Sequence, residues 1–593
     1  MRVDSGSRRS GGRGAVGLGC AIAIAIAGCA HRPTAPLAGD STRAVKILAV
    51  NDFHGQLPAG KLVDGRPAGS APVLAAYLRS AMAGKESRTV LVEAGDLVSA
   101  SPASSALLQD EPTIAFFNSF ANASCGTLPP PEGQSQGADR FDALFDPGCN
   151  LVGVPGNHEF DRGVAELMRL LGGGNHRSGP FLDDPWRGAR FPVVASNVRK
   201  ASGETLFRPY VVKVIDSVRV AFVGAGQRDT PHLVSPSGVA GIAFDDEATS
   251  INAQVPELQA KGIHAIVAVV HDGGSGQAPY VGPTDPAATG LSADVNKLVA
   301  RLDTDVDVLV TAHTHAFANA LLPNAGGREV LVVQANSAGT AFAHIDLVVD
   351  RTSGDVVGKT ARIVTTFADV ALTPDPAAAR LTAAAAAKIA PVAGRIVARV
   401  AGVISRTPSA AGESPLGELV ADAQRAAAGG ADFAITNAGG VRADLPPSCG
   451  SPACTVTWGD CFAAQPFSNR VVSSTLTGQQ LYRLLEQQWA NQDAPSILQI
   501  SGFGYTWSAS APAGMKVVPG SVRKADGTRV EPGVSYVVAM NDFLSAGGDG
   551  FTVLKEGKPA TVGPLVLDAL VAFLKAQPQP VSWAPDERVQ RVP

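Results

Sequence analysis

Five short, continuously apolar runs constrain the fold of the first half of this chain more than any other feature. The runs are VKILAV, TVLVEA, NLVGV, HAIVAVV and VDVLV, and Ala/Leu-rich helical stretches alternate with them between Val45 and about Ala368. Strands without polar alternation are typical of sheets that are covered on both faces. Because 593 residues exceed what one hydrophobic core holds, the sequence predicts an α/β domain here and at least one further domain.

A polar motif follows each of the five runs. In open α/β folds the carboxyl ends of the strands form the ligand-binding edge, so motifs in this position are expected to converge. Five of the ten histidines of the chain lie there, and packing alone does not explain that placement. The side chains delivered to this edge are Asp52, His54, Asp96, Asn157, His158, Asp161, His271, His313 and His315.

Seven of these side chains have the chemistry of metal ligands. Buried imidazoles and carboxylates need partners or a metal, and mixed His, Asp and Asn donors suit Mn, Zn, Fe or Co. Seven donors exceed the needs of one tetrahedral zinc ion, but they fit two divalent ions, about 3.5–4 Å apart, that share a bridging carboxylate. The predicted ligands are Asp52, His54, Asp96, Asn157, His271, His313 and His315.

A second α/β unit is predicted over residues 393–593, after an Ala-rich linker helix over residues 371–392. Three of its segments stand out: ITNAGGVRADLP, QPFSNRVV and MNDFLSAGGDGFTVL. Glycines in the first and the third allow a ligand to approach the backbone closely. Arg442 offers a planar fork for a phosphate or a carboxylate. Phe467 and Phe543 could sandwich a flat ring, or they could simply anchor their loops.

These motifs resemble two known domain families. The order Asp-x-His, Gly-Asp, Gly-Asn-His-Glu, a later His and a final His-x-His is similar to that of the calcineurin-like metallophosphoesterases. The three segments of the second unit resemble the C-terminal domain of the secreted 5′-nucleotidase family. That family includes bacterial UDP-sugar hydrolases, ecto-5′-nucleotidases and 2′,3′-cyclic-nucleotide phosphodiesterases. The combined resemblance covers nearly all of residues 45 to 575.

The resemblance implies a fold and a role for each site residue. The fold is a calcineurin-like α/β sandwich with a dimetal site over residues 45–370, joined by the linker helix to an α/β substrate-binding domain. One metal would take Asp52, His54, Asp96 and His315, and the other would take Asp96, Asn157, His271 and His313. His158 would meet the phosphoryl oxygen or the leaving group, held by Asp161, and Glu159 is expected only to cap a helix. The substrate contacts would be Asn437 and Arg442 at the phosphate, Phe467 and Phe543 on the base, and Asp549 at the ribose.

The sequence departs from the family pattern at three positions. Ala312 replaces the glycine of the last metal motif, and Ala100 stands where the second motif often has glycine. The family usually has a further arginine just before the helix that reads LGELVADA here. The nearest candidate, Arg406, is displaced from that position. Part of the phosphate clamp is therefore open to doubt, and a substrate other than a simple monophosphate stays possible.

The predicted activity is that of an exported dimetal phosphohydrolase, which removes phosphate from nucleotides by attack of a metal-activated water. A UDP-sugar hydrolase, and a 2′,3′-cyclic-nucleotide phosphodiesterase or 3′-nucleotidase, are alternatives on the same metal core. A thiosulfohydrolase-like enzyme and a non-catalytic nucleoside-binding lipoprotein are more distant alternatives. The net charge is −4 and no basic tract is present, so a nucleic acid polymer is not expected as a partner. The oligomeric state stays open.

The N-terminus predicts export and a lipid anchor. Residues 1–28 combine arginines with an apolar run too short to span a bilayer, as in a signal peptide. The run ends in IAGC, which resembles a bacterial lipobox, so Cys29 would carry lipid and residues 29–44 would form a tether. An ordinary signal peptide cut nearby is the alternative. The predicted location is the cell envelope, facing the periplasm or the exterior, and the export route stays open.

Export makes disulfides possible. Cys125 with Cys149 would close a Pro/Gly-rich excursion over residues 118–150. Two of Cys449, Cys454 and Cys461 could pair and leave one free, and the sequence does not say which two.

Overall fold

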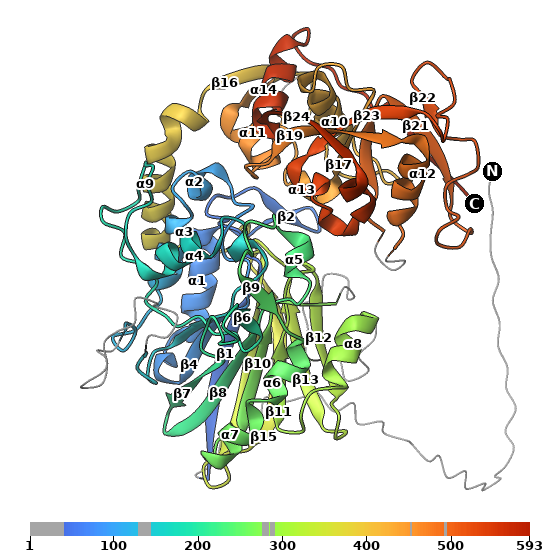
Figure 1. The fold of residues 1–593 in the computed structure, drawn as a ribbon. Helices are drawn as coiled ribbons and strands as arrows, with labels where there is room; N and C mark the ends of the chain where they lie inside the picture. The colour runs from blue at the N-terminus through green and yellow to red at the C-terminus, as the bar shows by residue number, and fades with distance from the viewer. Residues whose placement is uncertain (1–40, 128–143, 275–283, 285–290, 451–452, 491–494) are drawn as a thin grey trace, which may run out of the picture. The chain divides into compact units, whose positions relative to one another are not determined.

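The structure is a computed structural model that describes residues 41–127, 144–274, 284, 291–450, 453–490 and 495–593. The predicted signal peptide, the lipidation at Cys29 and nearly all of the tether lie outside these residues. The described residues belong to one compact unit, Ala35–Pro593. It has a two-domain α/β architecture (Figure 1).

Two sheets pack face to face in the N-terminal domain. The first sheet has the strand order β15-β14-β1-β4-β5 and the second has the order β12-β13-β11-β10-β8-β7. The first consists of β1 (Thr42–Val50), β4 (Thr89–Glu93), β5 (Leu151–Gly153), β14 (Ala341–Asp350) and β15 (Val356–Thr365). The second consists of β7 (Tyr210–Ile215), β8 (Val218–Ala225), β10 (Ala265–Val270), β11 (Val306–Val310), β12 (Phe317–Pro323) and β13 (Glu329–Ala335).

The strands that precede the polar motifs run parallel inside each sheet. β1, β4 and β5 are parallel neighbours in the first sheet, and β10 and β11 are parallel neighbours in the second. Antiparallel pairings lie toward the sheet edges, at β14, β15, β7 and β12. All motif-bearing strands therefore end on the same side of their sheet.

Both faces of each sheet are buried, as the apolar runs predict. Successive residues alternate between two cores, so Ile47 and Val267 enter the core between the sheets while Leu48 and Ile266 face helices. The helices α1 (Ala71–Met82) and α3 (Glu111–Asn118) cover the first sheet, and α9 (Pro376–Ala393) packs against both of these helices. The helices α6 (Glu247–Asn252), α7 (Val255–Ala260) and α8 (Ala293–Val299) cover the second (Figure 1).

Short elements complete this domain. They are the hairpin β2 (Lys61–Val63) and β3 (Arg66–Ala68), the pair β6 (Val198–Lys200) and β9 (Ile242–Phe244), the helices α2 (Ala103–Ala106), α4 (Val164–Gly172) and α5 (Thr230–Leu233), and the 3-10 turns η1 (Glu86–Arg88) and η3 (His158–Phe160).

The predicted linker helix corresponds to α9. Asp375 caps its start by accepting hydrogen bonds from the backbone amides of Ala377 and Ala378. Ala378, Ala385 and Ile389 pack into the helix-facing core of the first sheet.

The C-terminal domain contains one mixed sheet with the order β20-β17-β23-β19-β24. Its strands are β17 (Phe433–Asn437), β19 (Arg470–Thr477), β20 (Leu498–Ser501), β23 (Ser535–Asn541) and β24 (Lys558–Leu565). One core holds α10 (Pro415–Ala427) and α14 (Val566–Ala576), and another holds α12 (Gly478–Gln487). Smaller elements are β16 (Ile396–Val400), β18 (Cys454–Thr457), β21 (Phe503–Ser508), β22 (Arg523–Lys524), β25 (Val589–Val592), α11 (Trp458–Ala464), α13 (Asp542–Ser545), η4 (Ala438–Gly440), η5 (Gly548–Gly550) and η6 (Thr552–Glu556).

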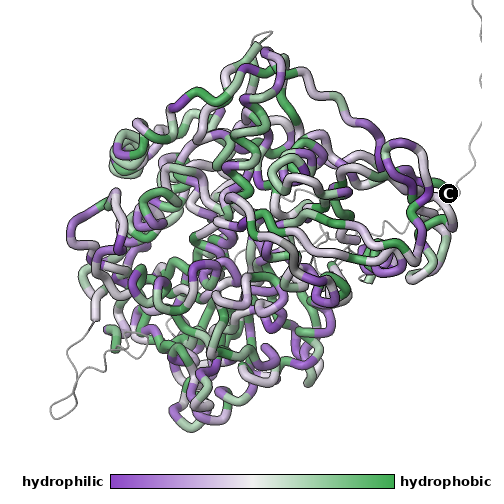
Figure 2. The backbone as a smooth tube through the Cα atoms, turned by 45° about the horizontal axis from the view of Figure 1, so that its top comes forward, coloured by the Kyte–Doolittle hydropathy of each residue, from purple (hydrophilic) through white to green (hydrophobic). Residues whose placement is uncertain are grey.

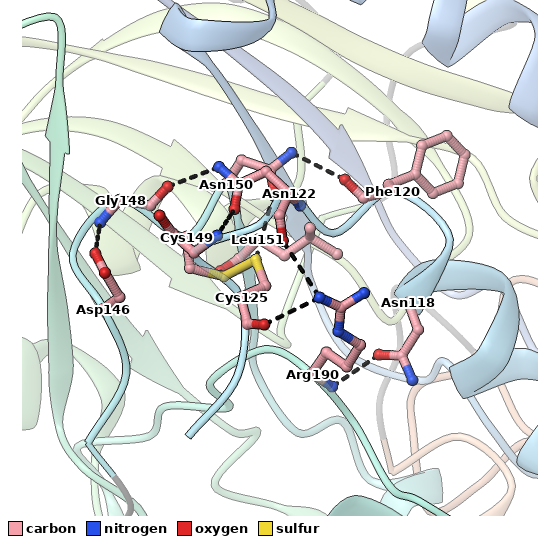
Figure 3. Close-up of a disulfide and its surroundings, with 11 residues drawn as sticks. Asn118, Phe120, Asn122, Cys125, Asp146, Gly148, Cys149, Asn150, Leu151 and Arg190 are labelled. Carbon is pink, nitrogen blue, oxygen red and sulfur yellow. Dashed lines mark hydrogen bonds between the residues drawn. A yellow bond between two sulfur atoms is a disulfide. The ribbon is translucent and has the colours of Figure 1, made fainter. Parts of the chain in front are cut away.

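The disulfide pattern resolves what the sequence left open. Cys125 pairs with Cys149, Cys449 pairs with Cys454, and Cys461 stays free and buried. Figure 3 shows the first disulfide with Asn150, whose side chain accepts from the amide of Asn122 at 2.9 Å and donates to a backbone carbonyl.

None of the described helices is long and apolar enough to cross a membrane. Figure 2 shows hydrophobic residues interspersed with hydrophilic ones along the backbone.

Candidate active site

The ends of five strands bring all seven predicted metal ligands together. The loop after β1 carries Asp52 and His54, the loop after β4 carries Asp96, and the loop after β5 carries Asn157. The second sheet adds His271 after β10, and His313 and His315 after β11. Three groups of donor atoms each lie within 4.8 Å of one another: Asp52, His54 and His315; His54, Asp96 and His158; and Asp96, His271 and His313.

Most of these residues have left-handed backbone conformations. The φ angles are 50° for Asp52, 48° for His54, 52° for Asp96, 70° for His313 and 52° for His315. Such conformations cost about 1 kcal/mol or more for a non-glycine residue and persist only where the surroundings fix them. Here the amide of Asp52 donates to a carbonyl in the next loop at 3.0 Å, and that of His54 donates to the carbonyl of Asp96 at 2.9 Å. Concentrated backbone strain is typical of a functional site.

Two glycines in the motifs make room for the ligands. A Cβ atom on Gly156 would lie 2.2 Å from Oδ1 of Asp96, and one on Gly95 would lie 2.4 Å from Nδ1 of His271. The Gly-Asp and Gly-Asn pairs in the sequence therefore reflect close packing between the loops after β4 and β5 and the imidazole from β10.

The imidazoles are oriented as metal ligands are. Nδ1 of His271 donates to the carbonyl of Ala94 at 2.8 Å, which leaves Nε2 without a hydrogen-bond partner and 3.2 Å from a carboxylate oxygen of Asp96. Nδ1 of His54 donates to the carbonyl of Ser99 at 3.0 Å, and its Nε2 lies 3.1 Å from Nε2 of His315. Lone pairs that face one another and a carboxylate fit a cation between them.

The pKa shifts of three of these side chains also favour a bound cation. Burial lowers the pKa of His313 to about 4, so this imidazole is neutral and able to ligate. Burial opposes the charge on His271, but the adjacent Asp96 outweighs it and raises the pKa of His271 to about 10. Burial likewise opposes ionisation of Asp96, yet the surrounding histidines hold its pKa well below the ordinary range. The negative field that attracts a proton here also attracts a divalent cation.

His158 and Asp161 form a pair beside the ligands. Nδ1 of His158 donates to a carboxylate oxygen of Asp161 at 2.7 Å, which turns Nε2 toward the donor cluster. Burial lowers the pKa of His158, but Asp161 and Asp96 outweigh it, so the net shift is upward. The pair can therefore hold a proton at Nε2.

Glu159 has a different position from the one expected. Its carboxylate caps no helix. It accepts hydrogen bonds from the amides of Gly156 at 2.6 Å, Asp96 at 2.8 Å and Leu97 at 2.9 Å. The side chain thus ties the loop after β4 to the loop after β5. Sequence reasoning missed this role because its partners are backbone amides, which leave no residue pattern.

One cavity of about 400 Å³ is lined by two of the predicted metal ligands and by all five predicted substrate contacts. From the N-terminal domain it is lined by Asn157, His158, Asp161 and His313. From the C-terminal domain it is lined by Asn437, Arg442, Phe467, Phe543 and Asp549.

Comparison with known proteins agrees with this geometry. The calcineurin-like phosphoesterase family matches residues 45–317, and the 5′-nucleotidase C-terminal domain matches residues 392–556. The cell wall protein Lmo0130 of Listeria monocytogenes is 31% identical over 93% of this chain and 70% of its own length. The chain belongs to the 5′-nucleotidase family.

A second relative and a solved structure are also similar to most of this chain. The endonuclease YhcR of Bacillus subtilis is 32% identical over 95% of this chain, which spans only 42% of YhcR. The structure of a 5′-nucleotidase precursor from Thermus thermophilus has 25% identity and a TM-score of 0.72, and covers 93% of this chain and 99% of its own. Members of this family are phosphoric ester hydrolases, and so is this chain. Calcineurin-like phosphoesterases bind two metal ions, and the His/Asp clusters here are able to hold them.

The two alanines that depart from the calcineurin-like metallophosphoesterase pattern are accommodated differently. Ala100 adopts φ 48°, a left-handed conformation that glycine takes without strain, and it lines the cavity. Ala312 is fully buried in the core between the two sheets.

The predicted base-stacking residues are not equivalent. The ring of Phe467 lies nearly parallel to the imidazole of His158, with centroids 5.8 Å apart. Phe543 is 8% exposed and belongs to a core of the C-terminal domain, where Gly548 packs so closely that an added Cβ would lie 2.4 Å from its ring. Phe543 therefore anchors its loop and also lines the cavity, and its stacking on a base stays a prediction.

A series of side-chain hydrogen bonds fixes Asn437 and Asp549, two polar residues of the C-terminal domain that line the cavity. Nδ2 of Asn541 donates to Oδ1 of Asn437 at 3.0 Å, and Nδ2 of Asn437 donates to Oδ2 of Asp549 at 2.8 Å. Asp549 has φ 52°, and burial raises the pKa of its carboxyl group. Asn437 and Asp549 are thus held in place beside the cavity.

Proposed function

We propose that the chain is an exported dimetal phosphohydrolase that removes phosphate from nucleotides. The observation that carries this proposal is the single cavity, which places the His/Asp donor clusters next to two aromatic rings, an arginine and an Asn–Asp pair. A phosphate ester, a flat base and a sugar hydroxyl would each find a chemically matched partner there.

The metal ligands would divide into two sets that share Asp96. Asp52, His54 and His315 would complete one set, and Asn157, His271 and His313 would complete the other. Bound divalent ions would supply a nucleophilic water at neutral pH and neutralise charge on the phosphoryl oxygens. Glu159 would keep the two loops that carry Asp96 and Asn157 in register.

His158 would donate its Nε2 proton to a phosphoryl oxygen or to the leaving oxygen. Asp161 would stabilise the charged imidazole and hold its orientation through Nδ1. Arg442 would contact the phosphate, Phe467 and Phe543 would hold the base, and Asn437 and Asp549 would bind near the phosphate and at the ribose.

Export and lipidation at Cys29 belong to this proposal. Two disulfides in the described residues favour an oxidising compartment, and the similar Lmo0130 is named a cell wall protein. UDP-sugars, 2′,3′-cyclic nucleotides and 3′-nucleotides remain alternative substrates. A sulfur ester and binding without turnover remain the more distant alternatives.

Phosphate release by purified residues 31–593 with Mn²⁺ tests the proposal. The substrates would be AMP, UDP-glucose, 2′,3′-cyclic AMP and bis-p-nitrophenyl phosphate, with a single-stranded oligonucleotide added because one relative is named an endonuclease. We expect turnover of a mononucleotide that is lost in His158→Ala. Activity on bis-p-nitrophenyl phosphate alone would support the proposed metal site but contradict the proposal that nucleotides are the substrates. Degradation of the oligonucleotide in preference to AMP would contradict the mononucleotide proposal as well.

A further inference from the structure

A second cavity lies in the C-terminal domain and shares no lining residue with the candidate active site. Its volume is about 660 Å³. The loop before α10, the start of α10 and the C-terminal segment that contains β25 surround it. Of the charged residues that line this cavity, Glu413, Glu418 and Glu587 are acidic and Arg591 is basic.

Two of these carboxylates are buried, and each uses only one of its two oxygens. Glu413 is 4% exposed and Glu418 is 1% exposed. Oε2 of Glu413 accepts from the amide of Val589 at 2.6 Å, and Oε2 of Glu418 accepts from the amide of Asp586 at 3.0 Å. Within the described parts of the chain, Oε1 of each glutamate has no hydrogen-bond partner. A buried carboxylate oxygen is costly unless a proton, a water or a cation satisfies it.

The basic side chains nearby are engaged with other groups. Arg588 pairs with Asp422 at 2.9 Å and with Asp586 at 2.8 Å. The guanidinium of Arg591 lies over the ring of Trp507, 5.4 Å from its centroid. In the part of the chain that the structure describes, neither buried glutamate forms an ion pair with a basic residue. The negative charge on this side of the cavity is therefore left to a partner from solution.

The two buried carboxylates also disfavour each other's ionisation. Burial raises the pKa of Glu413 to about 7 despite the hydrogen bond from Val589, and the charge of Glu418 adds to the rise. Burial likewise raises the pKa of Glu418. A water molecule would neutralise neither carboxylate, whereas one divalent cation between them would neutralise both.

We propose that Glu413 and Glu418 form a Ca²⁺ site through their Oε1 atoms. Carboxylate donors without imidazole or thiolate suit hard cations. Ca²⁺ accepts six to eight oxygens in irregular geometry, whereas Mg²⁺ demands a near-ideal octahedron and loses water reluctantly. The volume of the cavity leaves room for waters that would complete the coordination of Ca²⁺. The site is independent of the proposed activity, because none of the predicted catalytic, metal-binding or substrate-binding residues lines this cavity.

The bound ion would stabilise the attachment of the C-terminal segment to α10. The same two glutamates that would bind Ca²⁺ also hold the amides of Asp586 and Val589. Neutralising their charge would remove the repulsion between them without breaking these hydrogen bonds. The expected effect of Ca²⁺ is therefore on the stability of the C-terminal domain.

The test measures Tm at pH 8 of EDTA-treated, desalted protein with and without about 10 mM CaCl₂. Sites with few charged ligands bind Ca²⁺ with a Kd of about 0.1–1 mM. Such binding is expected to raise the Tm of a domain of this size by about 3–10 °C. In Glu418→Gln the rise is expected to fall below about a third of the wild-type rise, because one of the two charged ligands is lost.

Two more variants complete the design. Glu413→Gln is expected to lose the rise in the same way, and it keeps the test decisive if Glu418→Gln does not fold. Glu556→Gln is the matched control, because Glu556 is in the same domain but pairs with Arg483 at 2.8 Å on the surface. It is expected to show the full wild-type rise.

The readout separates a Ca²⁺ site from a purely structural role of the glutamates. If they only held backbone amides, Glu418→Gln would lower Tm in Ca²⁺-free buffer and leave the Ca²⁺-dependent rise unchanged, which would overturn the proposal. Equal rises in all four proteins would place Ca²⁺ at another site. No rise in the wild type, or an equal rise with NaCl at the same ionic strength, would also reject the proposal.

Discussion

Replacing Gly156 by alanine should disable the donor cluster without changing any donor. The added Cβ would lie 2.2 Å from Oδ1 of Asp96, 2.5 Å from the amide nitrogen of Asp96 and 2.7 Å from Cε1 of His271. Ordinary contact requires these atoms to retreat by about 1 Å, and Asp96 belongs to two of the three donor groups. A misplacement of about 1 Å at a reacting centre costs roughly 100-fold in rate.

The assay measures kcat for bis-p-nitrophenyl phosphate and the metal content of the same sample, which avoids any assumption about the natural substrate. We expect kcat to fall by about 100-fold or more and bound Mn²⁺ to fall below the wild-type stoichiometry. Gly402→Ala is the control, because an added Cβ there meets nothing within 4 Å. Retention of full metal content with kcat within about threefold of wild type would refute the reasoning, since it would mean that Asp96 is not held against Gly156.

Three further predictions concern residues around the site and in the C-terminal domain. Asp161→Asn should lower kcat by roughly 10- to 100-fold at unchanged metal content, because His158 loses the carboxylate that fixes its proton at Nδ1. Steady-state kinetics and metal analysis of the same sample would measure both quantities. Glu159→Gln should weaken Mn²⁺ binding by roughly 10- to 100-fold in a calorimetric titration, because an amide replaces a carboxylate that accepts from three backbone amides. Burial raises the pKa of Glu413 from 4.5 to about 7, so the folded state binds this proton more tightly than the unfolded state does. The free energy of unfolding of the protein is therefore expected to fall as the pH rises from 4.5 to about 7. Glu413→Gln should therefore raise Tm at pH 8 by the equivalent of up to about 3 kcal/mol, with the gain shrinking toward pH 5, and a pH-independent change in Tm would contradict this explanation.

The parts of the site that sequence predicted are those that leave a pattern along the chain. Asp52, His54 and Asp96 follow continuously apolar strands, and the parallel order of β1 and β4 turns that sequence position into proximity. His313 joins them from the second sheet for the same reason. The pairing of Cys449 with Cys454 rather than Cys461 depends on tertiary placement, which no spacing rule fixes.

The parts that sequence could not predict act through contacts between distant segments. Glu159 binds backbone amides, whose positions no side-chain motif records. Phe543 was ambiguous because a ring that fills a core and a ring that lines a cavity have the same sequence environment. Only packing against Gly548 shows that it does both.

The division of the donors between two sheets has a consequence for how the enzyme acquires its metals. Asp52, His54, Asp96 and Asn157 come from one sheet, and the three remaining imidazoles come from the other, so no complete ligand set exists until the two sheets have packed. Proteins select among similar divalent ions by site geometry, by ligand type and by which ions are available when the site forms. The compartment in which this chain folds would therefore set which ions are available to the proposed metal sites. Export before folding would load it from the surroundings of the cell, and export after folding would load it from the cytoplasmic pool.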